Sequence, residues 1–264
     1  MLYFIATPIG NLKDISFRAV EKLKEVDVIA CEDTRKSLIL LNRYEIKKRL
    51  ITYHKDNEKN SADGIIKLLE EGKEVAVISD SGMPVISDPG NYLTKKLHEK
   101  NIEYSVIPGA NAGLCALILS GLDARRFSFI GFLPEKNKEI NILLEEIKTY
   151  ENTLIFYISP HNLEKDIKKI YEVLGDRNAS LVSEITKMFE KTINFKLSEF
   201  EEMQIEARGE FVLVVEGAEK KQNKLTKLSL EEQIDFYIES GMSKKEALKK
   251  VAKDNQIKNI YKMI

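Results

Sequence analysis

The stretch SDSGMPVISDPG, Ser79–Gly90, gathers residue types that contribute little to a hydrophobic core. It follows the apolar run EVAVIS, which is typical of a buried strand. Asp80 comes just past this run, where a carboxylate could bind an ammonium group or ribose hydroxyls. Gly82 lets the main chain approach a ligand closely, and Pro84 stiffens the loop. The stretch therefore predicts a crevice for a small amphipathic molecule held largely by main-chain groups.

Asp88, in the same stretch, has a simpler structural explanation. The pair Asp88-Pro89 is typical of a helix N-cap followed by proline at the first helical position. We therefore expect Asp88 to begin the next helix.

The segment CEDTR, Cys31–Arg35, brings three charged side chains to the end of another apolar run. Either Asp33 or Thr34 could cap the following helix. Arg35 could instead hold a phosphate or a carboxylate in a bidentate manner. A structural role and a ligand-binding role both remain open for this segment.

Two later segments carry polar residues near predicted strand ends. In SPHNL, Ser159 or Asn162 could cap a helix, and His161 could face a substrate or lie on the surface. In SEITKMFEKT, Glu184 and Lys187 belong to a charge run that is most simply a solvated edge. If this run faces the crevice, it supplies a Lys/Glu pair there.

Several common catalytic motifs are absent from the sequence. It has no GxxxxGKS/T loop, no GxGxxG after the first predicted strand, no HExxH and no GxSxG elbow. The three histidines are scattered, and Cys31 and Cys115 lie in no paired metal-ligand spacing. We therefore expect no metal site, and two buried free thiols in a reducing compartment.

The first half of the chain alternates short apolar runs with helical segments. The runs LYFIA, DVIAC, LITYH, EVAVIS and YSVIP are each followed by a predicted helix. This alternation indicates βαβ units with a mainly parallel sheet, and therefore an α/β fold. Ligands bind at the carboxyl ends of the strands in such sheets. The loops TPIGN, CEDTR, SDSGMPVISDPG and PGANAG should therefore line one crevice.

We expect three parts in the chain. A first α/β domain over residues 1–131 carries the crevice loops, a second follows over 132–219, and a small helical domain covers 220–264. The segment GFLPEKNKE, Gly131–Glu139, is interpreted as a linker. Hairpin-like and crossover connections both occur in the second domain, which predicts a mixed sheet.

The C-terminal segment is rich in lysine. From Glu219 to Ile264 there are 11 lysines and no arginine against 7 acidic residues, whereas the whole chain has a net charge of −1. Two or three short helices fit here, one of them with a capping box from Ser243 to Glu246. Lysines near Lys244 could grip a phosphate backbone, or they could form a solvated face on a dimer arm.

The sequence gives no sign of export or of membrane insertion. The N-terminal MLYFIATPIG lacks a basic region and meets Pro8 too soon for a signal peptide. The apolar stretch AGLCALILSGL has about half the ~20 residues that span a bilayer. We expect a cytoplasmic protein.

The loop segments, taken together, resemble those of one protein family. In order, they are TPIGNLKDIS, CEDTR, SDSGMPVISDPG, GFLPEK, FYISPHNL, SEITKMFE and GEFVLVVEG. Over nearly its whole length the chain resembles ribosomal RNA small subunit methyltransferase I, the cytidine-2′-O-methyltransferase branch of the tetrapyrrole-methylase superfamily. The resemblance implies two α/β domains with S-adenosylmethionine in the cleft between them, a small C-terminal helical domain and a homodimer. It also implies methyl transfer to the ribose 2′-oxygen of a cytidine in the decoding region of 16S rRNA, within the small ribosomal subunit.

The resemblance also implies which residues contact the cofactor. By position these are Pro8, Gly10, Asp80, Gly82, Met83, Pro84, Asn111 and Ala112 in the first domain, with Tyr157 and the GEF strand in the second. The chain departs from the family pattern at five positions: Ser81, Met83 and Asn111 in the cofactor loops, Ile158 where an acid is usual, and Asn162 where an arginine is usual. The last change removes a possible phosphate contact.

The sequence names no obvious catalytic base. Methyl transfer requires the oxygen, the methyl group and the sulfur in line, and a base or a cation would help the poorly acidic hydroxyl to react. The candidates are Asp33, Glu184 and Lys187. Contacts to the RNA substrate are expected from Arg35, Lys136, Lys138, His161 and Lys244.

Two other functions remain open. The cofactor loops are compatible with a tetrapyrrole C-methyltransferase acting on a corrinoid precursor, although CEDTR, the SPH loop and the basic tail favour RNA. A non-catalytic ribosome assembly factor is the second alternative, and Met83 and Asn111 are the features that would support it.

Overall fold

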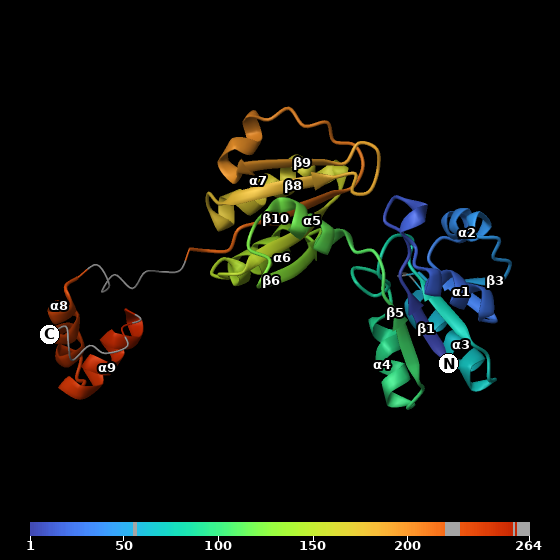
Figure 1. The fold of residues 1–264 in the computed structure, drawn as a ribbon, viewed down its shortest axis with the longest axis horizontal. Coiled ribbons are helices and arrows are strands. Elements are labelled where there is room, and N and C mark those ends of the chain that lie inside the picture. Colours follow the sequence, from blue (N-terminus) through green and yellow to red (C-terminus); the bar gives the residue numbers. More distant parts are fainter. Residues whose placement is uncertain (55–56, 220–227, 256, 258–264) are drawn as a thin grey trace. The chain divides into compact units, whose positions relative to one another are not determined.

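The computed structural model describes residues 1–54, 57–219, 228–255 and 257. The chain divides into two compact units, Met1–Ala218 and Glu219–Ile264. The first unit contains two five-stranded sheets with their helices, and the second contains a pair of helices (Figure 1).

The first sheet is parallel throughout and has the strand order β3-β2-β4-β1-β5. Its strands are β1 (Leu2–Ile5), β2 (Val28–Cys31), β3 (Arg49–Thr52), β4 (Val75–Ile78) and β5 (Tyr104–Ile107). The helices between them are α1 (Phe17–Glu25), α2 (Thr34–Arg43), α3 (Glu58–Glu70) and α4 (Asn91–Glu99). The predicted parallel α/β architecture is confirmed. Because β2, β4, β1 and β5 are adjacent, the loops that follow them meet at one edge of the sheet.

The central strands β1, β2 and β4 are buried on both faces, which explains why they are almost continuously apolar. Alternate residues of a strand point to opposite faces, so Phe4 joins a cluster that contains Leu93 of α4 and Ile65 of α3, whereas Ile5 joins a cluster that contains Leu23 of α1. Cys31 is buried in the second cluster, and burial raises the pKa of its thiol. The helices α1 and α2 therefore cover one face of the sheet, and α3 and α4 cover the other.

The second sheet is mixed, as predicted, and has the order β6-β7-β10-β8-β9. Only β6 and β7 are parallel neighbours; the other pairs are antiparallel. The strands are β6 (Phe127–Phe132), β7 (Thr153–Ile158), β8 (Asn178–Ser183), β9 (Lys191–Lys196) and β10 (Phe211–Val215). The helices α6 (Asn137–Ile147) and α7 (Leu163–Leu174) pack on one face, and α5 (Ala112–Ser120) packs on the other. In the part of the chain that the structure describes, the connections also contain the 3-10 turns η1 (Leu12–Asp14), η3 (Pro160–Asn162) and η4 (Leu197–Glu202).

The segment interpreted as a linker, residues 131–139, is largely regular structure. Gly131 and Phe132 belong to β6 and pair with β7, and α6 begins at Asn137. The register of β6 shifts between Phe129 and Gly131, and Gly131 has a φ of 73°. This bulge needs a glycine, and a glycine close to a proline reads as a loop in the sequence. The linker interpretation was therefore wrong.

The second unit contains α8 (Leu230–Glu239) and α9 (Lys244–Asp254), which pack through a small core that includes Ile234, Leu248 and Val251. The capping box from Ser243 to Glu246 is confirmed. A further helix predicted after residue 256 lies outside the described residues, apart from Ile257. No helix in the described part of the chain is long and apolar enough to cross a bilayer.

Candidate functional site

A pocket of about 430 Å³ lies where the loops of the first sheet meet strands of the second. The loops after β1, β2, β4 and β5 all contribute side chains, so the predicted crevice is confirmed. These loops supply Ile9, Glu32, Lys36, Asp80, Gly82, Met83, Asp88 and Asn111, among others. The second sheet supplies Phe132, Tyr157, Ser159, Glu210, Phe211 and Val212, among others.

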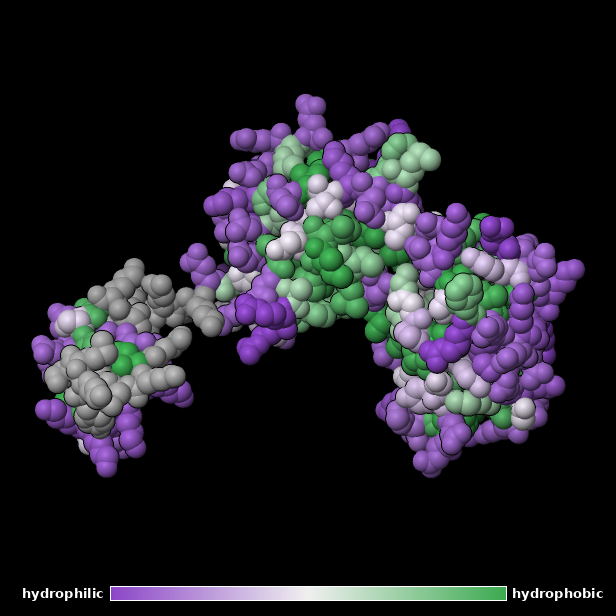
Figure 2. Space-filling view, viewed as in Figure 1, coloured by the Kyte–Doolittle hydropathy of each residue, from purple (hydrophilic) through white to green (hydrophobic). Residues whose placement is uncertain are grey.

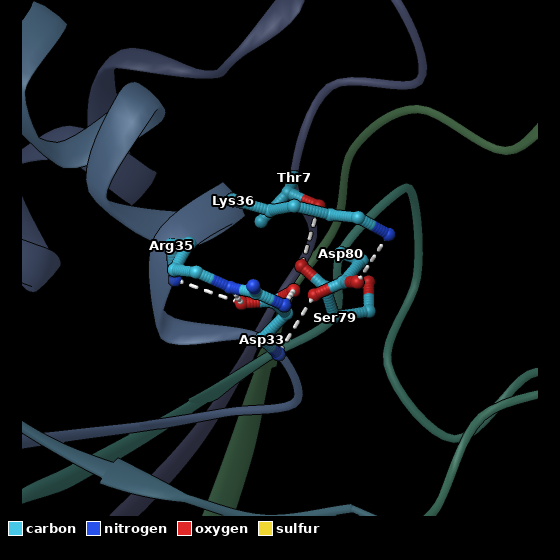
Figure 3. A network of polar contacts seen from close by, with 6 residues as sticks. All are labelled: Thr7, Asp33, Arg35, Lys36, Ser79 and Asp80. Carbon is cyan, nitrogen blue, oxygen red and sulfur yellow. Dashed lines mark hydrogen bonds and ion pairs between the residues drawn. The ribbon is translucent and has the colours of Figure 1, made fainter.

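The loops after β1 and β4 are fastened to each other at the base of the pocket. Thr7 and Gly82 exchange two main-chain hydrogen bonds of 2.9 and 3.2 Å. The Thr7 hydroxyl also donates to the Ser79 carbonyl at 3.2 Å (Figure 3). Gly82 has a φ of 82°, and an added Cβ atom would lie 3.2 Å from Cγ2 of Ile9. A glycine is therefore required at the point where the main chain lines the pocket.

Asp80 connects this loop to the CEDTR segment. One of its carboxylate oxygens accepts a hydrogen bond from the Asp33 main-chain N–H at 3.1 Å, and the other binds Nζ of Lys36 at 2.9 Å (Figure 3). Asp33 itself caps α2, because its side chain accepts from the Arg35 N–H at 2.9 Å. The Arg35 guanidinium also binds the Asp33 carboxylate and holds the pKa of that group at about 2. Asp80 therefore lines the pocket and also holds the CEDTR segment at the pocket rim.

Asp88 lines the pocket and does not cap α4, so the expected N-cap was wrong. The N-cap of α4 is Gly90, and the Glu58 carboxylate of α3 accepts from the main-chain N–H groups of Gly90 and Tyr92 at 2.8 and 3.2 Å. Val85 and Ser87 have φ values of 75° and 66°, so the chain turns twice through the left-handed region before the helix. These turns carry Asp88 away from the helix start.

Burial raises the pKa of Asp88 to about 7, with further contributions from the nearby Glu32 and Asp80 carboxylates. Burial also raises the pKa of Glu32. Among the residues lining the pocket, Glu32, Asp80, Asp88 and Glu210 are acidic, and Lys36 is basic. The side chains therefore favour a ligand that carries positive charge.

The wall from the second sheet is mainly aromatic and aliphatic. The Tyr157 hydroxyl accepts a hydrogen bond from the Gly113 N–H at 3.3 Å, which ties β7 to the first turn of α5. The Tyr157 ring makes edge contacts with Phe129 and Phe132 at centroid distances of 5.0 and 5.4 Å. Asn111 caps α5 by accepting from the Leu114 N–H at 3.0 Å and lines the pocket as well.

Six of the nine residues expected to contact a cofactor line this pocket: Asp80, Gly82, Met83, Asn111, Ala112 and Tyr157. Pro8, Gly10 and Pro84 do not line it. Gly10 instead lies against the β8–β9 loop, where an added Cβ atom would be 2.9 Å from Cγ of Lys187.

The three candidate bases lie outside the lining. Asp33 is the cap of α2, and Glu184 and Lys187 form an ion pair of 2.9 Å in the β8–β9 loop. The residues expected to contact RNA do not line the pocket either. Arg35 is exposed beside Asp33, Lys136 pairs with Glu139 at 3.2 Å, Lys138 lies on α6 and His161 lies in η3. Lys244 is the first residue of α9 in the second unit.

Sequence reasoning missed Glu32, Lys36 and Phe132 as pocket residues, whereas Glu210 and Phe211 belong to the GEF strand that the resemblance implied. Glu32 stands inside CEDTR, and its position directly after β2 was a usable signal. Phe132 follows from the pairing of β6 with β7, which the sequence alone did not reveal. Within the part of the chain that the structure describes, no group of three His, Cys, Asp or Glu side chains is arranged to hold a metal ion.

Comparisons with known proteins identify the family of the chain. Residues 1–201 match the family model of Tetrapyrrole (Corrin/Porphyrin) Methylases. The chain is 43% identical to ribosomal RNA small subunit methyltransferase I of Halalkalibacterium halodurans, over 98% of this chain and 94% of that protein. It is 42% identical to the protein of the same name from Bacillus subtilis, over 97% and 90% of the two chains.

The fold also matches a solved structure. Uroporphyrin-III-C-methyltransferase from Thermus thermophilus superimposes with a TM-score of 0.60 at 18% identity, over 81% of this chain and 93% of that one. At this identity the likeness concerns the fold. The chain belongs to the tetrapyrrole methylase family, in the branch whose members are named ribosomal RNA small subunit methyltransferase I.

Proposed function

We propose that the pocket binds S-adenosylmethionine. The observation that carries this proposal is the composition of the lining, in which four carboxylates surround the space and Lys36 is the basic member. S-adenosylmethionine carries a positively charged sulfonium and an ammonium group, which such a lining would favour. A volume of about 430 Å³ lies in the usual range for small-molecule sites. Gly82 lines the pocket and has no side chain, so the ligand could lie directly against the main chain there.

We infer that the acceptor is the ribose 2′-oxygen of a cytidine in the decoding region of 16S rRNA. Two features support this inference: the high similarity to proteins named ribosomal RNA small subunit methyltransferase I, and the sequence segments that resemble the cytidine-2′-O-methyltransferase branch. A small ribosomal subunit as substrate would place the protein in the cytoplasm.

S-adenosylmethionine, when bound, supplies a methyl group that its sulfonium already activates. The protein must then position the ribose and accept the proton of its hydroxyl. Asp88 is the proton acceptor that the pocket supports best, because it lines the space and its pKa is raised to about 7. At neutral pH such a carboxylate is partly ionised and can accept a proton. Asp33, Glu184 and Lys187 support this role less well, since they lie outside the lining.

RNA binding outside the pocket is proposed for exposed basic residues. Arg35 projects from the start of α2, one residue before the pocket-lining Lys36. Lys136, Lys138 and His161 lie near the starts of α6 and α7, and Lys244 opens α9. Their positive or titratable side chains suit phosphate contacts, which position RNA without reading its sequence.

We also propose a homodimer. Figure 2 shows a large apolar area on the side of the second sheet that carries α5 and β6. Exposed apolar residues there include Leu114, Ile118 and Leu119 of α5, and Phe127 and Phe129 of β6. Apolar areas of this kind are typical of surfaces that associate. Sedimentation of the wild type and of I118K would test the dimer, and a wild-type monomer at micromolar concentration would contradict it.

The function is tested by incubating the protein with radiolabelled S-adenosylmethionine and unmethylated small ribosomal subunits, followed by nuclease mapping of the label. Label on a single cytidine ribose is the expected result. Cofactor binding without transfer to subunits or to naked rRNA would contradict the RNA proposal, and a corrinoid precursor would then be the next acceptor to assay. Failure of calorimetry to detect cofactor binding would contradict the pocket assignment itself.

A further inference from the structure

The β8–β9 loop, residues 184–190, exposes two large apolar side chains at its tip. Met188 is 90% exposed and Phe189 is 77% exposed. Exposing two adjacent apolar side chains to water is unfavourable, and an aromatic residue in such a position often serves a binding surface.

Hydrogen bonds within the loop hold its shape. The Glu190 carboxylate accepts from the Thr186 N–H at 2.8 Å, and the Glu190 N–H donates to the Lys187 carbonyl at 3.1 Å. Glu184 and Thr186 have φ values of 53° and 66°, which the loop maintains in spite of their cost. The exposed apolar tip therefore belongs to a loop whose conformation is held by its own hydrogen bonds.

The base of the loop adjoins the pocket. Ile185 is buried in the same cluster as Ile9 and Val212, both of which line the pocket. The Glu184 N–H donates to the carbonyl of pocket-lining Glu210 at 3.4 Å. The loop therefore starts at the rim of the pocket, and its tip, Met188 and Phe189, is exposed to solvent.

The charged residues around the apolar tip indicate what kind of partner could bind it. The two carboxylates of the loop are engaged internally, Glu184 with Lys187 and Glu190 with the Thr186 N–H. Lys191, directly after the loop, is exposed and forms no ion pair with any residue that the structure describes. An apolar and aromatic tip beside an unpaired lysine suits a single-stranded nucleic acid, whose bases stack on aromatic rings and whose phosphates attract lysine.

We propose that Phe189 stacks on a base of the RNA substrate next to the nucleotide that enters the pocket. This inference rests on the proposed function, because a ribose can enter a pocket of this kind only when its nucleotide leaves the helical stack. The neighbouring base then also loses a stacking partner, and the Phe189 ring, on the loop that starts at the pocket rim, replaces it. Phe189 is on this account a positioning residue for RNA.

The chain contains no tryptophan, which allows a direct test. In F189W the new indole is the sole tryptophan, and a single-stranded RNA oligomer with the decoding-region sequence should quench its fluorescence. The matched control is F17W, because Phe17 is 91% exposed at the start of α1 and does not line the pocket. Its fluorescence should change little with RNA.

Affinity measurements complete the test. F189A should weaken binding of the same RNA by about 5- to 100-fold, the usual range for loss of one stacked base, while calorimetry shows unchanged binding of S-adenosylmethionine. F189Y should retain RNA affinity, and F189L should lose it, because leucine preserves apolar contact without a ring to stack.

Three results would overturn the proposal. The first is wild-type RNA affinity in F189A together with no quenching in F189W. The second is a fall in the sedimentation mass of F189A, which would assign the tip to contact between two copies of the chain. Either of these two results would overturn the stacking proposal alone, because mapping of the methyl label with the wild type tests the proposed function independently. A wild type that methylates no RNA would reject the proposed function and this inference together.

Discussion

The two sheets of the first unit contribute opposite chemistry to one pocket. The first sheet presents loops with three carboxylates, Glu32, Asp80 and Asp88, together with Lys36. The second presents mainly apolar side chains, including Phe132, Tyr157 and Val212. One wall can select a ligand by charge and the other by shape.

The difference follows from how each sheet ends. Parallel strands stop at one edge without hairpins, so their loops carry polar groups that no neighbouring strand satisfies. In the second sheet β7 and β10 are antiparallel, and Tyr157 pairs with Val212 inside the ladder. The pocket therefore meets side chains on a regular strand there. Changes at the carboxylates of the first wall should alter charge and pH behaviour, and changes at the apolar residues of the second wall should alter contact alone.

The largest effect is expected from Asp80→Ala. The substitution removes a carboxylate from the pocket and also the acceptor that holds the Asp33 N–H and Lys36. The hydrogen bond from the Asp33 N–H to this carboxylate contributes about 1.5–3 kcal/mol, whereas the exposed Lys36 contact adds little. Its loss would loosen the pocket rim, so binding of S-adenosylmethionine should weaken by roughly 10- to 100-fold. Isothermal calorimetry at neutral pH measures this. Asp63→Ala on the exposed side of α3 is the matched control and should bind as the wild type does.

Asp88→Asn should change how stability depends on pH. The pKa of Asp88 is about 7 in the folded protein and lower in the unfolded chain, so the folded state holds its proton more tightly. Its contribution to stability is present below about pH 4 and is lost as pH rises through 7. The variant should therefore gain stability over the wild type at pH 8, on the order of 1–2 kcal/mol after allowance for solvent screening.

Urea unfolding at pH 5, 6, 7 and 8 checks this prediction. The wild type should lose stability across the series relative to Asp88→Asn, and a constant difference between the two proteins would contradict the raised pKa. The same variant should abolish the rise of methyl transfer with pH near 7 if Asp88 accepts the proton.

The sequence was sufficient to predict the first sheet and its crevice. Short apolar runs bounded by Gly, Pro and Asp identified β1, β2 and β4, because a strand buried on both faces has no polar positions to obscure it. The loops then followed, since parallel strands share one carboxyl edge. Asp80 and Gly82 were found in this way, and both line the pocket.

The second wall could not be predicted in the same manner. β6 contains a bulge at Gly131, and its pairing with β7 depends on contacts between segments more than twenty residues apart. Asp88 was predicted to cap α4 because Asp-Pro is a local N-cap signal. In the structure the N–H groups at the start of α4 donate instead to the carboxylate of Glu58, which belongs to α3. Tertiary contacts decided both cases, and they have no local sequence signature.

Tyr157→Phe tests the second wall. The substitution removes the hydroxyl that accepts from the Gly113 N–H at 3.3 Å and keeps the ring against Phe132. Loss of one neutral hydrogen bond should cost about 0.5–1.5 kcal/mol of stability. The loss should be equal at pH 6 and 8, because burial raises the pKa of the Tyr157 hydroxyl above its usual value and the group stays protonated. A loss that varied with pH would remove the distinction between the walls.

The smallest effect is expected from Lys36→Met, which removes the basic member of the charged wall and keeps a long apolar side chain. The Lys36–Asp80 ion pair spans 2.9 Å, but the Lys36 side chain is 65% exposed, so water and salt screen it. Exposed pairs contribute about 0.2–1 kcal/mol, and the variant should be destabilised by that amount at low salt and by almost nothing at 1 M salt. Urea unfolding at the two salt concentrations measures both values. A loss that persisted in high salt would mean that Lys36 stabilises the loop after β4 through packing of its side chain. The first wall would then be stabilised by side-chain packing, as the second wall is.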